Sequence, residues 1–380
     1  MEQKKNWWPV VIVVVLVVII GGLVGWQKGS VDKTAKVGFI SPMSGPAVVY
    51  GDYSRKAFQL ALEEWNNSHV NKIEVVYEDG KCSPADAVTA ANKLINVDKV
   101  NFLMTFCTGE TNAVAPIAEK NKIILLTSGT TAPNISKGNY IFRNIGSVAS
   151  GLPTLTKLAY EADKQLGLIS ENTDYAISTK DGFKQKYTAL GGAVLFDESF
   201  DSKSLDFKTI ITKFKNSNIE SIFVVVQSMD NSGILLKQMK ELNYHPKIFT
   251  TESVVSAESL VKYQKEGYEN MIEGAIFTQP YFDRENSIAK KMLGSYDAVN
   301  GATKGPVGEY YLATHYDAVY LIGDAVESVG NNPDAVRGYF MNLKNWVGAV
   351  GPFGFDETGD TVSQTQVNIV KDVNIVEYKG

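Results

Sequence analysis

The sequence predicts an α/β protein built from two lobes, each a doubly wound parallel sheet. The chain has 380 residues, which is more than one ordinary hydrophobic core accommodates. Apolar strands and amphipathic helices alternate along it in two successive sets. Alternation of this kind produces right-handed crossovers and a parallel sheet covered by helices. We therefore expect two α/β lobes in series.

The first set of elements runs from residue 36 to residue 126. Its first helix shows the expected spacing of apolar residues, at Ala57, Leu60, Ala61 and Trp65. The expected order is strand Val37 to Ser41, helix Tyr53 to Asn66, strand Lys72 to Glu78, helix Pro84 to Val97, strand Asn101 to Thr105, helix Thr111 to Lys120 and strand Ile123 to Leu126.

The second set begins near Ser150 and repeats the same alternation. The expected order is helix Leu152 to Ala162, strand Gln165 to Ser170, helix Tyr175 to Leu190, strand Ala193 to Ser199, helix Phe207 to Asn216, strand Ser221 to Val226, helix Ser232 to Leu242 and strand Lys247 to Thr250.

The remaining elements are divided between the lobes. Strand Gly274 to Thr278 and helix Tyr310 to Val329 are expected to return to lobe 1, and strands Val367 to Val370 and Asn374 to Tyr378 to complete lobe 2. This division assigns residues 35–148 and 275–346 to lobe 1, and residues 149–274 and 347–380 to lobe 2.

An apolar segment precedes both lobes. Residues Trp7 to Trp26 contain an unbroken run of Val, Ile and Leu from Val10 to Ile20. About twenty helical residues span the ~30 Å hydrocarbon layer, with tryptophans at its interfaces. A cleaved signal peptide has a similar order, but no Ala-x-Ala site follows the run and no cysteine precedes Cys82. We expect a single-pass signal anchor at residues 7–26, a cytoplasmic end at 1–6, a stalk at 27–34 and the lobes outside the cell membrane.

Charge and motifs exclude several function classes. A net charge of -5 argues against a nucleic-acid partner, because phosphate binding needs a basic face. The sequence has no glycine-rich nucleotide motif and no Gly-x-Ser-x-Gly, and its three histidines are far apart. We expect a protein that is not an enzyme and that binds neither a metal nor a cofactor.

The two cysteines, Cys82 and Cys107, follow two consecutive predicted strands. An even pair in an exported protein favours a disulfide, since the extracytoplasmic space is oxidising. The alternative is a pair of unlinked small core residues.

A turn rich in hydroxyl groups follows the fourth predicted strand, where open parallel sheets bind ligands. Thr127, Ser128, Thr130 and Thr131 offer hydroxyl donors, and Gly129 lets backbone amides approach a ligand. This chemistry suits a carboxylate. Most turns of this composition are only turns, so the alternative is local turn and cap chemistry.

Several ordered motifs resemble the substrate-binding proteins of branched-chain amino acid ABC transporters. The likeness covers nearly all of the chain after the apolar segment. The motifs are Val37-Gly38-Phe39-Ile40-Ser41-Pro42-Met43-Ser44-Gly45-Pro46, Tyr50-Gly51, Tyr77-Glu78-Asp79-Gly80-Lys81-Cys82, Asn92-Lys93-Leu94, Cys107-Thr108-Gly109, Thr127 to Pro133, Gln279-Pro280-Tyr281-Phe282 and Tyr316-Asp317-Ala318-Val319-Tyr320. The resemblance implies the type I periplasmic binding protein fold, in which two lobes joined by three crossovers close on a ligand.

The resemblance also implies a site. The α-carboxylate of an amino acid would bind Thr108 and Thr131, with Gly129 and Thr130 supplying backbone groups. The α-ammonium would bind Glu252, because a buried ammonium needs an opposite charge. The alternative for Glu252 is an acid that stabilises the N-terminus of a helix.

Tyr50 and Tyr175 match positions where aromatic rings line the cleft, one from each lobe. The chain departs from the family pattern at Gln227-Ser228-Met229-Asp230, where an aromatic residue is common. We therefore expect an α-amino acid ligand, aliphatic first and polar second, delivered to an ABC permease. The alternatives are a membrane-anchored sensor domain and a binder of amides, urea or other small carboxylates.

Overall fold

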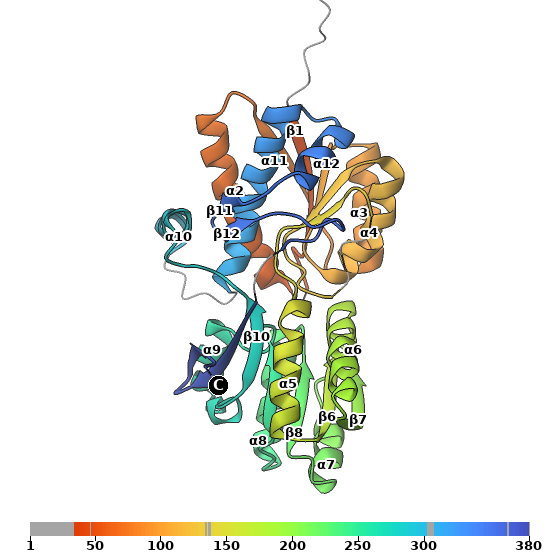
Figure 1. Ribbon diagram of the computed structural model, residues 1–380, viewed down its shortest axis with the longest axis vertical. Helices are drawn as coiled ribbons and strands as arrows, with labels where there is room; N and C mark the ends of the chain where they lie inside the picture. The colour runs from red at the N-terminus through yellow and green to blue at the C-terminus, as the bar shows by residue number, and fades with distance from the viewer. Residues whose placement is uncertain are drawn as a thin grey trace, which may run out of the picture.

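The computed structural model describes residues 34–45, 47–133, 135, 138–301, 308–362 and 365–379. These residues form two α/β lobes stacked end to end (Figure 1). The chain passes between the lobes after β5, after β10 and after β12. The segment expected to cross a membrane lies outside the described residues. Within them, no helix is long and apolar enough to span a bilayer.

Lobe 1 contains a five-stranded sheet in the order β2-β1-β3-β4-β5, with every pairing parallel. Its strands are β1 (Ala35–Ser41), β2 (Ile73–Asp79), β3 (Phe102–Thr105), β4 (Ile124–Thr127) and β5 (Ile141–Arg143). Its helices are α2 (Val48–Ser68), α3 (Pro84–Asn96), α4 (Thr108–Asn121), α10 (Ser287–Asn300), α11 (Glu309–Val329) and α12 (Pro333–Met341).

Both faces of this sheet are buried, as the apolar sequence of its strands predicts. Val37 and Phe39 of β1 pack into the core beneath α2 and α11, whereas Ile40 packs into the core beneath α3 and α4. Alternate side chains of one strand thus supply two cores. Helices on both faces leave the carboxyl ends of the strands to form the floor of a site.

Lobe 2 contains a seven-stranded sheet in the order β14-β13-β10-β9-β8-β6-β7. Its strands are β6 (Gln165–Glu171), β7 (Ala193–Phe200), β8 (Ser221–Val225), β9 (Lys247–Thr251), β10 (Ile276–Pro280), β13 (Thr365–Lys371) and β14 (Asn374–Glu377). Its helices are α5 (Leu152–Ala162), α6 (Asp174–Ala189), α7 (Lys208–Asn216), α8 (Met229–Glu241) and α9 (Ala257–Glu266).

Two features of lobe 2 differ from the expectation. The strand expected to return to lobe 1, here β10, pairs in parallel with β9 of lobe 2, because the short helix α9 connects β9 to β10 as a crossover. The sheet is also mixed, since β13 pairs antiparallel with both β10 and β14. Asp372 and Val373 have positive φ angles of 51° and 59°, and this tight turn reverses the chain into a hairpin.

The segment from residue 347 to residue 361 was expected in lobe 2 and lies in lobe 1. The hairpin of β11 (Trp346–Gly348) and β12 (Gly351–Phe353) begins it, and Ala349, Phe353 and Phe355 join the lobe 1 core. The carboxylate of Asp317 on α11 accepts the backbone N–H groups of Ala349 and Val350, at 2.6 and 2.9 Å. These contacts hold the segment on lobe 1 until the chain crosses to β13.

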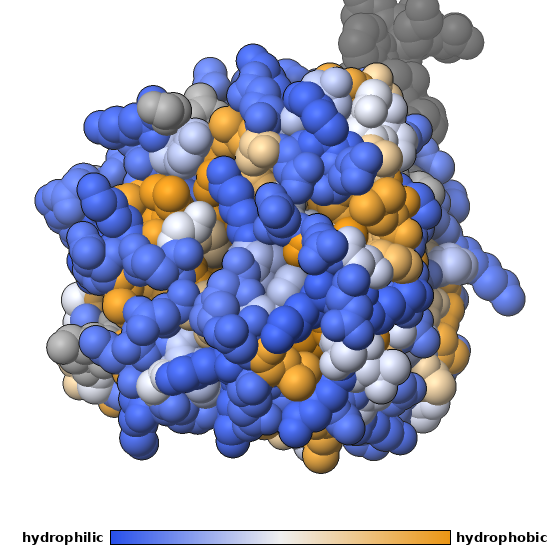
Figure 2. Space-filling model, turned by 90° about the horizontal axis from the view of Figure 1, so that it is seen from below, coloured by the Kyte–Doolittle hydropathy of each residue, from blue (hydrophilic) through white to orange (hydrophobic). Residues whose placement is uncertain are grey.

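The lobe 2 end of the molecule has a mainly hydrophilic surface. Seen from that end, hydrophobic residues occur as separate patches between charged and polar side chains (Figure 2). Such a distribution is normal for a lobe exposed to water.

The packing of α11 on α2 generates a test of the lobe 1 core. A Cβ at Gly323 of α11 would overlap the ring of Trp65, which is 1% exposed and cannot move aside. We expect Gly323→Ala to lower the free energy of unfolding by about 1 to 3 kcal/mol, the usual cost of overpacking.

Gly338 in α12 is the matched control, because a Cβ there meets nothing within 4 Å. Gly338→Ala should raise the free energy of unfolding by about 0.4 to 1 kcal/mol, through a less flexible unfolded chain. Urea denaturation of both variants checks the prediction, and effects of the same sign would contradict this packing.

Candidate functional site

A cleft lies between the lobes, where the carboxyl ends of strands from both sheets face each other. It holds about 540 Å³ of space, part of it open to solvent. The seven residues implied by the family resemblance line it, together with others that were not predicted, whereas Thr127 and Ser128 are not among its lining residues. The lining residues are Ala47, Tyr50, Phe106, Cys107, Thr108, Gly129, Thr130, Thr131, Tyr175, Gln227, Glu252, Ser253, Ser256, Gly308, Tyr310 and Tyr311.

The lobe 1 side of the cleft presents hydroxyl groups. Thr108 begins helix α4, and the Thr108 and Thr130 hydroxyl oxygens lie 2.5 Å apart. The N-terminus of a helix favours a bound anion through its free amides and its dipole. Residues 127–133, which we call the binding turn, lie beside this helix start. The two together make a site suited to a carboxylate.

Gly129 has a structural reason to be glycine, because a Cβ at this position would overlap the ring of Phe106. The aromatic wall of the cleft therefore packs directly against the backbone of the binding turn.

Glu252 supplies the charge on the lobe 2 side. It follows β9 and is 5% exposed. Its Oε1 accepts the Thr131 hydroxyl at 2.6 Å, across the lobes, and the Tyr175 hydroxyl at 3.1 Å. Its Oε2 is buried and has no hydrogen-bond partner among the described residues. A buried carboxylate oxygen left in this state is costly, and a cationic group would satisfy it.

Burial raises the pKa of Glu252 from 4.5 to about 7, against the lowering effect of the hydrogen bond from Thr131. Near neutral pH, the neutral and charged forms of Glu252 are therefore both populated in the ligand-free cleft.

Aromatic rings form one wall of the cleft. Tyr50 lies 6.1 Å from both Phe106 and Tyr311, measured between ring centroids, and Phe106 lies 5.6 Å from Tyr311. Burial raises the pKa of Tyr50 and Tyr311 above the ordinary value, so both phenols stay neutral. Tyr310 and Tyr311 were not predicted as cleft residues, because apolar spacing along α11 gives them the same appearance as core residues.

Of the polar segment at residues 227–230, Gln227 lines the cleft. Ser228 instead donates its N–H and hydroxyl to the Glu171 carboxylate, at 2.8 and 2.5 Å. Asp230 pairs with Lys262 at 2.6 Å. The departure from the family pattern thus contributes one amide side chain to the ligand space.

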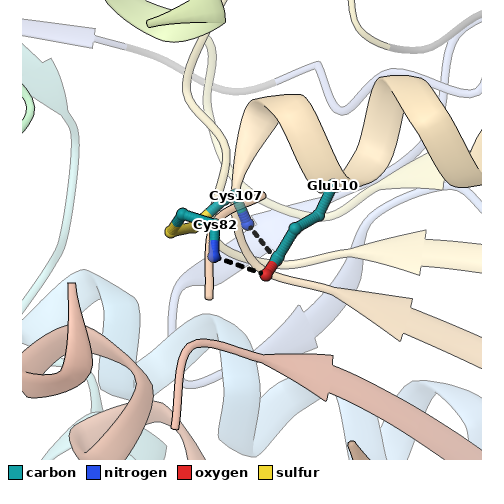
Figure 3. Close-up of side chains that lie close together, drawn as sticks. All are labelled: Cys82, Cys107 and Glu110. Atoms are coloured by element: carbon teal, nitrogen blue, oxygen red, sulfur yellow. Dashed lines mark hydrogen bonds between the residues drawn. A yellow bond between two sulfur atoms is a disulfide. The ribbon is translucent and has the colours of Figure 1, made fainter. Parts of the chain in front are cut away.

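Cys82 and Cys107 form the predicted disulfide, with Cα atoms 5.3 Å apart. Figure 3 shows the Glu110 side chain reaching from α4 to this pair, where its carboxylate accepts the N–H groups of Cys82 at 3.0 Å and Cys107 at 2.9 Å. These residues make up the one group with metal-binding side chains in the described part of the chain. Both sulfurs are bonded to each other in the disulfide, so they are not available to bind a metal. The disulfide and the hydrogen bonds of Glu110 instead fix the start of α4, beside Thr108.

A cleft of this kind, between two α/β lobes with hydroxyl groups facing a buried carboxylate, is that of a two-lobed solute-binding protein. The chain belongs to the periplasmic binding protein family, which matches residues 34–374. The Leucine-, isoleucine-, valine-, threonine-, and alanine-binding protein of Pseudomonas aeruginosa is 27% identical over 335 residues, covering 86% of this chain and 87% of that protein.

Two solved structures share the fold. A leucine-binding protein from Thermotoga maritima has a TM-score of 0.80 and 24% identity, covering 91% of this chain and 98% of its own. An ABC transporter solute-binding protein from R. palustris in complex with 4-hydroxybenzoate has a TM-score of 0.78 and 22% identity, covering 91% of this chain and 95% of its own.

The raised pKa of Glu252 generates a prediction about stability without ligand. The folded chain holds the carboxyl proton more tightly than the unfolded chain does. The free energy of unfolding therefore falls as pH rises from 4.5 to about 7. Glu252→Gln removes the buried charge, so it should stabilise the protein at pH 8 by up to about 3 kcal/mol and change little at pH 4.5. Urea denaturation at both pH values is the measurement, and an equal effect at both would contradict it.

Proposed function

We propose that this protein is the extracytoplasmic solute-binding component of an ABC transporter, and that it captures a branched-chain or related amino acid between its lobes. The observation that carries this proposal is the buried Oε2 of Glu252, which has no hydrogen-bond partner among the described residues. Glu252 lines a cleft whose opposite side offers hydroxyl groups. An α-amino acid matches both sides, since its ammonium pairs with the acid and its carboxylate accepts from the hydroxyls. The names of the relatives support the same ligand class.

Binding proceeds by closure of the lobes. Lobe 1 captures the carboxylate with Thr108, Thr131 and backbone groups at Gly129 and Thr130. Closure then brings Glu252 and Tyr175 onto the ligand. Because these contacts exist only when the lobes are together, the ligand favours the closed state. A permease recognises that state and receives the amino acid.

The wall formed by Tyr50, Phe106 and Tyr311 suits an apolar ligand side chain, and Gln227 adds one polar group at the cleft. Aliphatic amino acids are therefore the first candidates, and small polar ones such as threonine the second. Residues 7–26 anchor the protein in the cell membrane in this proposal, because their apolar length matches the hydrocarbon layer.

A second candidate is an aromatic or other simple carboxylate. The aromatic wall of the cleft and the 4-hydroxybenzoate complex of the R. palustris protein favour it. Such a ligand would leave Oε2 of Glu252 unpaired in the closed cleft, which argues for the zwitterion.

The proposal predicts the outcome of a ligand screen. Isothermal titration of the purified protein against the twenty amino acids, benzoate and 4-hydroxybenzoate should give heat with at least one aliphatic amino acid. Heat with the aromatic acids alone would support the second candidate. No heat with any amino acid would remove the proposal.

Glu252 is predicted to recognise the ammonium group. Glu252→Gln should weaken binding of the amino acid by at least ~1.5 kcal/mol, the scale of a hydrogen bond to a charged group. The same substitution should not weaken binding of the corresponding acid without its amino group. Equal losses with both ligands would place the ammonium contact elsewhere.

A further inference from the structure

We propose that Arg143 is a positioning residue, which holds the binding turn in its ligand-accepting shape and couples that turn to two of the segments connecting the lobes. Arg143 is the last residue of β5, where the chain leaves lobe 1 for the first time. Its side chain is 1% exposed. Because a buried guanidinium is tolerated only when it is paired, its partners show what it organises.

One side of the guanidinium engages Asp360. The Arg143 Nε donates to Oδ1 of Asp360 at 2.5 Å, and Nη2 donates to Oδ2. The backbone N–H of Arg143 also donates to the carbonyl of Gly359 at 2.9 Å. Asp360 belongs to the segment by which the chain leaves lobe 1 for the last time, before β13. The pair therefore fastens the first and last connections to each other.

The remaining nitrogen of the guanidinium engages the binding turn. The Arg143 Nη1 donates to the carbonyl of Ala132, and it lies 3.5 Å from the carbonyl of Thr130. A planar fork with donors on several edges can hold a carboxylate and backbone carbonyls at once. One buried cation thus links Asp360 to the residues on both sides of Thr131.

Two other carbonyls of the turn are held by neighbouring segments. The Thr314 hydroxyl of α11 donates to the carbonyl of Ser128 at 2.8 Å. The N–H of Val148, in the first connection, donates to the carbonyl of Thr131 at 2.8 Å. The C=O and N–H of one trans peptide point in opposite directions. The held carbonyls of Ser128, Thr130 and Thr131 therefore direct the next N–H groups, those of Gly129, Thr131 and Ala132, to the other side of the turn.

The hydrogen bonding of the backbone N–H groups in the binding turn is consistent with this arrangement. Within the described part of the chain, no backbone carbonyl accepts from the N–H groups of Gly129, Thr130 or Thr131. Three consecutive amides without a backbone partner among the described residues, beside the Thr108 hydroxyl, suit an anionic group. Arg143 makes no contact with the ligand in this account and acts through the shape of the turn.

The test compares Arg143→Lys and Asp360→Asn in the full chain with Asp197→Asn as a matched control. Asp197 forms ion pairs with the buried Lys180 at 2.6 Å and with Lys184 at 2.7 Å in lobe 2, and it does not line the cleft. Lysine keeps the charge at 143 but lacks the fork. If Arg143→Lys does not fold, Asp360→Asn carries the test.

The first measurement is amide hydrogen exchange without ligand, at Asn144 and Val148, whose N–H groups donate to the binding turn. We expect exchange about ten-fold faster in Arg143→Lys and Asp360→Asn, the equivalent of one lost charged hydrogen bond, and unchanged in Asp197→Asn. Wild-type rates in the first two variants would overturn the proposal.

The second measurement is Kd for the amino acid found by titration, and this part rests on the proposed function. Both variants, and the double variant, should bind about ten-fold more weakly, because the two residues act as one unit. Asp197→Asn should bind within about two-fold of wild type. If Arg143→Lys and Asp360→Asn bind the amino acid with the same Kd as the wild type, the proposed coupling between Arg143 and the binding turn is overturned. If the wild type binds no amino acid, the proposed function fails while the exchange measurement still decides the role of Arg143.

Discussion

One hydrogen bond across the cleft depends on the whole architecture, and it runs from the Thr131 hydroxyl to the Glu252 carboxylate at 2.6 Å. Thr131 lies in the turn after β4 and Glu252 directly after β9. These positions face each other because parallel strands in both sheets present their carboxyl ends at the same edge. Glu252 and the binding turn therefore form opposite sides of the same cleft.

Glu252 differs physically from the other strongly buried acids of the chain. Burial raises the pKa of Glu110, Asp317 and Glu252 alike to about 7. Glu110 and Asp317 each accept two backbone N–H groups, one on each oxygen. Glu252 has one buried oxygen without a partner in the part of the chain that the structure describes. The first two acids stabilise loops, whereas the third retains an unsatisfied acceptor that a ligand can fill, as is usual where function opposes stability.

Long amphipathic elements were predictable from the sequence, and short or long-range features were not. Helix α5 was predicted with its observed bounds, because apolar residues recur through three turns. Strand β5 and the hairpin of β11 and β12 have three residues each, too few to show a period. Strand β10 belongs to the lobe 2 sheet because it pairs with β9. No local sequence pattern indicates this pairing.

The same contrast between local patterns and long-range features applies to the candidate site. Thr108, Thr131 and Glu252 lie shortly after strands, so the alternation of strands and helices is enough to predict that they lie at the cleft edge of each sheet. Tyr310 and Tyr311 lie at the start of a long helix, and apolar spacing there cannot distinguish a cleft wall from a core.

The pairing of Arg143 with Asp360 could not be predicted from the sequence, because 217 positions separate the two residues. Their pairing joins two connections that are remote in sequence but adjacent between the lobes. In the proposed mechanism, connections that are fastened together move as one body, so closure displaces lobe 2 while the binding turn keeps its shape. The carboxylate receptor of lobe 1 is then formed before the ligand arrives, and closure adds the contacts of Glu252 and Tyr175.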